Sequence, residues 1–213
     1  MRRYLPWSGI IHLFSAVLAA IGAIWLIATT PYASTAQIVA AIYGVSLTLL
    51  FVFSTLSDIT VFHERWVSRW QKVDHAFIFV FIAACYTPLC MFKLTGTYGV
   101  VLLSTVWVLA ALGALFKLFV FHAPRWISTG LYLALGWLAI VAVGPITRGL
   151  SWGALTLLFA GAGLYTVGAL IYASRRCDFW PGVFGNHEVW HTMVTSASAC
   201  HFAFIAAFIL PGT

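Results

Sequence analysis

Residues 8–29 read SGIIHLFSAVLAAIGAIWLIAT, a run of 22 residues without aspartate, glutamate, lysine or arginine. A helix needs about 20 consecutive, mostly apolar residues to cross the hydrocarbon core of a bilayer. The run is too long for the apolar core of a secretory signal peptide, and no clear cleavage site follows it. We therefore expect it to form the first membrane span.

Six more apolar stretches follow the first one along the chain. The seven predicted spans are residues 8–29, 36–57, 74–92, 98–121, 126–146, 150–173 and 187–210. Turn-forming residues lie between several of them, such as Pro31, Pro124, Arg148-Gly149 and Pro181-Gly182. The predicted fold class is therefore all-α: a polytopic membrane protein in which residues 1–213 form a single domain of seven transmembrane helices.

The composition supports a membrane protein and excludes a soluble one. Hydrophobic residues make up 62% of the chain and charged residues only 8%, with a mean hydropathy of +1.00. A soluble domain carries about 25% charged residues, and a chain of this length has too little interior to bury so much apolar surface. The formal net charge of +6 then indicates orientation and contact with lipid headgroups, and we expect no nucleic-acid partner.

The basic residues are distributed unevenly between the two ends of the predicted spans. If the N-terminus is cytoplasmic, the outer side carries only Lys93 and Arg148, and the other nine of the 11 lie inside: Arg2, Arg3, Arg65, Arg69, Lys72, Lys117, Arg125, Arg175 and Arg176. Cytoplasmic loops of membrane proteins are enriched in lysine and arginine. This predicts a cytoplasmic N-terminus, a C-terminus outside, and a multi-pass protein of the cell membrane, of the bacterial inner-membrane type.

The acidic residues gather on the same predicted inner side. All five lie there: Asp58, Glu64, Asp74, Asp178 and Glu188. His12, His75, His187 and His191 lie within one or two helical turns of that side. Ionisable groups at membrane depth are costly and tend to mark function. We therefore expect a site where the inner ends of spans two, three and seven meet.

The start of the seventh predicted span carries a possible metal-binding pair. His187 and His191 are four residues apart, which places both imidazoles on one face of a helix, a spacing that suits one metal ion. With Glu188 between them they also match H-E-x-x-H, in which the glutamate is the general base of a zinc protease. Alternatively, Glu188 only stabilises the helix N-terminus, where we expect Asn186 to be the N-cap.

Five blocks of sequence resemble one known family. They are residues 54–58 (STLSD), 73–75 (VDH) continuing to 86–88 (YTP), 131–137 (LYLALGW), 161–169 (GAGLYTVGA) and 181–191 (PGVFGNHEVWH). In this order they resemble the hemolysin III family, the bacterial branch of the progestin and adipoQ receptor (PAQR) proteins, which are related to alkaline ceramidases. The resemblance covers nearly the whole chain. It implies seven spans with a cytoplasmic N-terminus, and His12 lies where the family has a first-span histidine.

The resemblance also implies a zinc site. In the family, S-x-x-x-H near the end of span two supplies one ligand and H-x-x-x-H in span seven supplies two, while an aspartate at the start of span three activates the zinc-bound water. Carried over, the matching residues are Ser54, Asp74, His187 and His191. The position of the span-two histidine is occupied here by Asp58, which makes the implied ligand set Asp58, His187 and His191.

Asp58 changes the chemistry expected of the site. Two imidazoles and one carboxylate still form a competent zinc set. The added negative charge also favours a harder divalent metal such as Mn²⁺ or Fe²⁺. Alternatively, the metal is lost and Asp58 is a hydrogen-bond partner of His187 or Ser54.

The implied function is metal-dependent hydrolysis of a lipid amide or ester, with a membrane lipid as partner. Asp74 is then the catalytic proton acceptor, and Ser54 is a hydrogen-bond partner behind the metal ligands. Two alternatives stay open from the sequence: a non-enzymatic membrane-homeostasis or receptor-like protein with a vestigial metal site, and an intramembrane metalloprotease that depends on Glu188.

Overall fold

The computed structural model describes residues 7–59, 64–94, 96–120, 124–174, 179–180 and 183–210. Its helical elements are α1 (Trp7–Thr29), α2 (Thr35–Ile59), α3 (Glu64–Phe92), α4 (Thr97–Phe119), α5 (Arg125–Gly136), η2 (Trp137–Ala142), α6 (Val143–Gly149), α7 (Trp152–Ser174), α8 (Asn186–Phe204) and η3 (Ile205–Ile209). Of the residues in the charge count, Arg2, Arg3, Arg175, Arg176 and Asp178 lie outside the described ranges.

The all-α prediction with seven spans is confirmed, since seven helices within the described ranges are long and apolar enough to cross a membrane. Three consecutive elements, α5, η2 and α6, make up the fifth span, and α8 continues into η3 to make the seventh. Many large apolar side chains point outward, among them Phe14, Ile24 and Val100, each more than half exposed. An apolar surface of this extent is suited to lipid, not to water.

The third helix begins earlier than the apolar stretch predicts. We expected it at about residue 74, but α3 begins at Glu64. The intervening residues contain no glycine or proline and include good helix formers, so the helix continues beyond the apolar region. There the Arg69 guanidinium lies over the Trp66 ring, 5.2 Å from its centroid. Asp74 therefore lies well inside a helix and not at its start.

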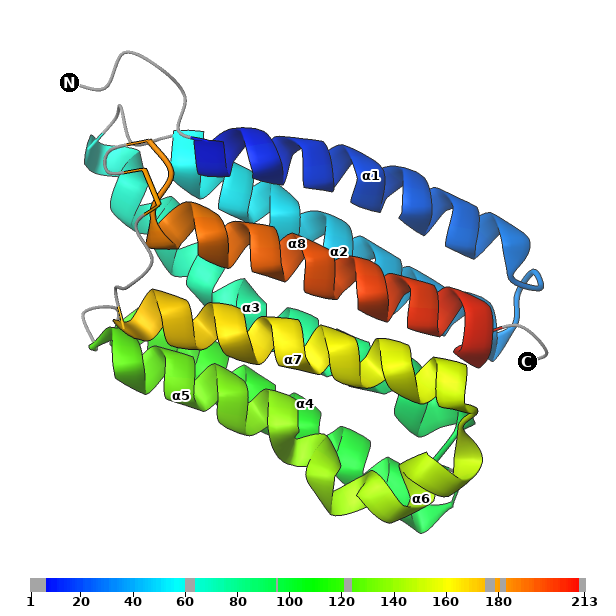
Figure 1. The fold of residues 1–213 in the computed structure, drawn as a ribbon. Coiled ribbons are helices and arrows are strands. Elements are labelled where there is room, and N and C mark those ends of the chain that lie inside the picture. The colour runs from blue at the N-terminus through cyan, green and yellow to red at the C-terminus, as the bar shows by residue number, and fades with distance from the viewer. Residues whose placement is uncertain are drawn as a thin grey trace.

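The helices form one bundle in which α1 and α5 lie on opposite sides (Figure 1). The closest pairs are α1 with α2, α2 with α3, α3 with α4, and α7 with α8, and α1 also contacts α8. The contact between α1 and α8 brings the first and last spans together. It positions the site described below.

The fifth span is interrupted, which the apolar pattern does not predict. Pro145 has no N–H, so it cannot donate to the carbonyl of Val141 four residues earlier; the Tyr98 hydroxyl donates to that carbonyl instead, at 2.5 Å. At the other end of the interruption, the Tyr86 hydroxyl donates to the Gly136 carbonyl at 2.6 Å and accepts from the Ala139 N–H at 2.8 Å. Side chains thus satisfy backbone groups that lipid cannot.

We expect the α1–α2 contact to be sensitive to a single methyl group. A Cβ added at Gly44 would lie 2.8 Å from the Ala23 Cβ and 3.0 Å from its Cα, so Gly44→Ala should destabilise the protein by about 1–3 kcal/mol. The control is Gly163→Ala, where an added Cβ meets nothing within 4 Å and higher helix propensity makes the change neutral or stabilising. Thermal unfolding in detergent measures both, and equal melting temperatures would contradict the close packing.

Candidate metal centre

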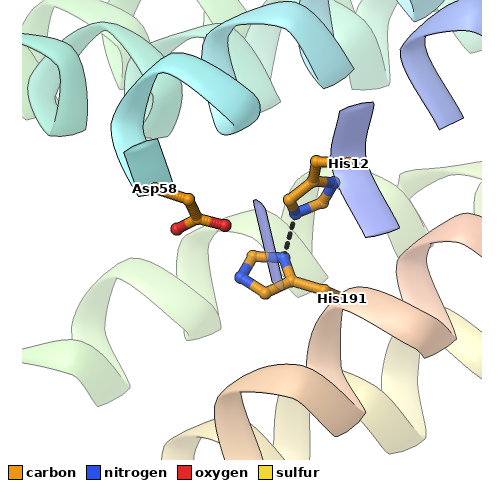
Figure 2. A group of neighbouring side chains, drawn as sticks. All are labelled: His12, Asp58 and His191. Carbon is orange, nitrogen blue, oxygen red and sulfur yellow. Dashed lines mark hydrogen bonds between the residues drawn. The ribbon is translucent and has the colours of Figure 1, made fainter. Parts of the chain in front are cut away.

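Three helices bring a metal-binding set of side chains together. His12 lies on α1, Asp58 in the last turn of α2, and His191 on α8, and each offers a ligand atom within 4.8 Å of the other two (Figure 2). All three side chains are buried, with exposed fractions of 1%, 8% and 7%. Among the described residues, these two histidines and one aspartate form a group with the spacing of a metal site.

The two imidazoles and the carboxylate face one another. His12 Nε2 is in direct contact with His191 Nδ1, and the rings are nearly perpendicular, at 81°, with centroids 4.0 Å apart. The Asp58 carboxylate points toward this pair (Figure 2). Its Oδ2 is buried and has no hydrogen-bond partner among the described residues. An unpartnered buried carboxylate oxygen is costly, and a divalent cation at this point would remove that cost. The donor set therefore fits a metal ion.

His187 lies beside this group. Its Nε2 is 2.8 Å from His191 Nε2, and the ring centroids are 4.2 Å apart, as the spacing of four residues on a helix predicts. The two nitrogens of His191 thus face different imidazoles, Nδ1 facing His12 and Nε2 facing His187. The set implied by the sequence and the set assembled by the structure share Asp58 and His191. The ligand role of His187 remains a prediction.

Ser54 and Asp74, the two residues expected to act on the reaction, are brought together across α2 and α3. The Ser54 hydroxyl donates to Asp74 Oδ1 at 2.5 Å, and both side chains are buried. The second carboxylate oxygen, Oδ2, lies 3.8 Å from Nδ1 of His75. Ser54 is one helical turn before Asp58, so the side chain that contacts Asp74 and the Asp58 carboxylate lie on the same face of α2.

A cavity of about 570 Å³ connects these residues. Its wall includes His12, Ser54, Asp58, Asp74, His187 and His191. Apolar side chains such as Leu50, Phe81 and Val194 line other parts of it, and it extends along the bundle to Tyr165 and His201. A cavity that combines a few polar groups with apolar walls is typical of sites that bind amphipathic molecules.

Comparison with known proteins agrees with the resemblance seen in the sequence. Residues 6–202 match the family described as Haemolysin-III related. The chain belongs to this family. Hemolysin-3 of Bacillus cereus is 35% identical over 206 residues, which cover 96% of this chain and 91% of that protein. The hemolysin-3 homolog of Bacillus subtilis (strain 168) is 39% identical over 161 residues, covering 76% and 72%.

The family relationship extends to animal proteins. The monocyte to macrophage differentiation factor of Homo sapiens is 27% identical over 174 residues, which cover 78% of this chain and 68% of that one. That protein is a member of the PAQR superfamily, which confirms the wider assignment. This haemolysin-III related protein is therefore a membrane protein of a superfamily with both bacterial and animal members.

Glu188 stabilises the beginning of the seventh span. Its Oε2 accepts a hydrogen bond from the Gly185 N–H at 2.9 Å, and the N-cap of α8 is Gly185. The expectation that Asn186 is the N-cap was wrong, because the glutamate reaches back to Gly185 and the helix begins one residue earlier, at Asn186. The carboxylate that a protease of the H-E-x-x-H type uses as its base is thus engaged in a helix cap here.

His12 is the site residue that sequence reasoning did not include among the ligands. Two signals pointed to it: its depth, within two turns of the inner end of the first span, and its match to the first-span histidine of the resembled family. Nothing in a single sequence says that the first span packs against the last. The contact of α1 with α8 supplies that information.

The two ligand sets predict different losses of metal. We expect protein purified in detergent to carry near-stoichiometric zinc or another divalent metal by elemental analysis. His12→Ala and Asp58→Ala should lose most of it, because each removes one of three converging donors, whereas His187→Ala should retain it. His201→Ala, a change in the same cavity but farther along α8, is the matched control.

The reverse pattern, with metal lost in His187→Ala and kept in His12→Ala, would favour the set implied by the sequence. Wild-type protein that takes up no metal even from added zinc would contradict both sets.

Proposed function

We propose that this haemolysin-III related protein is a metal-dependent hydrolase that cleaves an amide or ester bond of a membrane lipid. The observation that carries the proposal is the shared cavity. One wall holds the buried group His12, Asp58 and His191, and the hydrogen-bonded pair Ser54 and Asp74 opens into the same space. A metal-binding set beside a positioned carboxylate is the arrangement that metal-assisted hydrolysis requires.

The donor set fits zinc, and its carboxylate also accommodates a harder ion such as Mn²⁺ or Fe²⁺. When bound, such an ion polarises an acyl carbonyl and makes water a better nucleophile near neutral pH. The side chains of the protein supply the proton acceptor and hold it in position. Asp74 takes the proton of the attacking water, and the Ser54 hydroxyl, which donates to Asp74 Oδ1, fixes the direction of that carboxylate. Ser54 is thus a positioning residue and Asp74 the catalytic one.

A lipid substrate follows from the walls of the cavity and its place in the bundle. The cavity lies among membrane-spanning helices and is lined in part by aliphatic and aromatic side chains. We propose that hydrolysis takes place at the cytoplasmic side of a bacterial cell membrane. The excess of basic residues at the inner ends of the spans supports this orientation, and two similar proteins are from Bacillus species.

The variant Asp74→Asn tests the mechanism. We expect it to keep its metal and to lose lipid hydrolysis by a factor of about 100 or more, since the amide cannot accept the proton. Ser54→Ala should lower the rate less, because it only releases the orientation of Asp74. The assay follows released fatty acid by mass spectrometry, with ceramide as an amide substrate and phosphatidylglycerol as an ester substrate.

Glu188→Gln is the matched control, an acid-to-amide change at a helix cap that should leave hydrolysis intact. Equal turnover by wild type and Asp74→Asn would contradict the mechanism. A metal-loaded wild type that releases no fatty acid from either substrate would instead favour a non-enzymatic role in the membrane.

A further inference from the structure

The same cavity has a second polar region, which the proposed hydrolysis does not use. Lys117 lies in the last turn of α4 and is only 3% exposed. Its Nζ donates to the Ser128 Oγ on α5 at 2.9 Å, and both residues line the cavity. A lysine near the end of a membrane span usually extends toward the headgroup region. Lys117 instead points inward, at the cost of removing its ammonium from water.

A second cation lies one helical turn before Ser128, the hydrogen-bond partner of Lys117. Arg125 begins α5, and its guanidinium carbon is 5.0 Å from the centroid of the Tyr172 ring. Arg125 and Tyr172 both line the cavity, as does Thr129 beside Ser128. Two cations and two hydroxyl groups from α4 and α5 thus border one part of the space. Lysine, arginine and serine or threonine hydroxyls are the side chains that commonly bind phosphate.

The two polar regions of the cavity differ in charge. The metal-binding group comes from α1, α2 and α8, and the cations come from α4 and α5. Since α1 and α5 lie on opposite sides of the bundle, the cavity reaches across it (Figure 1). The carboxylates of Asp58 and Asp74 would offset the charge of a divalent cation in the first region, whereas Lys117 and Arg125 attract an anionic group to the second. This difference in charge would orient an anionic amphipathic molecule with its anionic group at Lys117 and Arg125.

An adjoining apolar cavity favours a lipid over a small anion. It measures about 190 Å³, and its lining includes Leu89, Ile140 and Phe204. Tyr86, Trp137 and His201 line both cavities, so the two spaces adjoin. Residues of the interrupted fifth span form part of its wall. The apolar walls of this space suit an acyl chain, whereas they would add nothing to the binding of free phosphate.

We propose that Lys117 and Arg125 bind the phosphate of an anionic phospholipid, with an acyl ester directed toward His12, Asp58 and His191. The substrate class is then a phospholipid ester and not a neutral amide. This inference rests on the proposed hydrolysis for its biological meaning, but phosphate binding is measurable without turnover.

Isothermal titration calorimetry on the full-length protein in detergent tests the proposal. The probes are dioctanoyl phosphatidylglycerol, dioctanoylglycerol, which has the same chains without the phosphate, and inorganic phosphate. We expect the wild type to bind phosphatidylglycerol more tightly than either of the others. Lys117→Met and Arg125→Met should each weaken phosphatidylglycerol about tenfold or more, because each removes a charged donor, and leave dioctanoylglycerol unchanged.

Lys93→Met is the matched control, since Lys93 is not among the residues that line the cavity and its loss should change nothing. Lys117→Arg keeps the charge and should keep most of the affinity. Size-exclusion chromatography establishes that the variants are folded. Because binding is measured without turnover, a failure of the hydrolase proposal leaves this test intact.

Three results would overturn the proposal. The first is equal affinity of the wild type for phosphatidylglycerol and dioctanoylglycerol. The second is unchanged phosphatidylglycerol affinity in folded Lys117→Met and Arg125→Met. The third is inorganic phosphate bound as tightly as the lipid, which would make the region a site for free phosphate.

Discussion

The packing of α1 against α8 is the constraint on which the site depends, because it brings His12 into contact with His191, 179 residues later in the chain. Polar groups buried in a membrane protein need partners, since lipid offers none. Here the partners come from the first, second and last spans, so each ligand helps to hold helices that are distant in sequence. Small residues such as Gly44, which packs against Ala23, let the backbones of α1 and α2 approach closely.

The sequence was sufficient for the class of fold and for most of the span boundaries, because a bilayer requires long apolar runs and the chain shows seven of them. It was less informative wherever side chains replace lipid as the local environment. The early start of α3 at Glu64 and the interruption after Gly136 both depend on polar and aromatic residues that hydropathy does not describe. The hydroxyls of Tyr86 and Tyr98 support that interruption through tertiary contacts.

The sequence brought together the right neighbours where local spacing or a family motif applied, and missed a neighbour where a long-range contact decided. The four-residue spacing correctly implied the contact between His187 and His191, and the motif residues Ser54 and Asp74 do lie in hydrogen-bond contact. His12 carries no local motif that pairs it with α8. Its place beside Asp58 and His191 is a property of the assembled bundle, which one sequence without a structure does not specify.

The carboxylate of Asp58 has a consequence that reaches across the cavity. With a divalent cation, two neutral imidazoles and one carboxylate give a site with one positive charge less than three imidazoles would. Such a site attracts an anionic group less strongly, and Asp74 nearby weakens that attraction further. The phosphate of an anionic lipid would therefore be attracted less strongly to such a metal site and would bind preferentially at Lys117 and Arg125. With the proposed metal and the proposed anionic lipid, the carboxylate on α2 and the inward-pointing lysine on α4 thus act in the same direction: both would leave the metal free for a neutral acyl carbonyl.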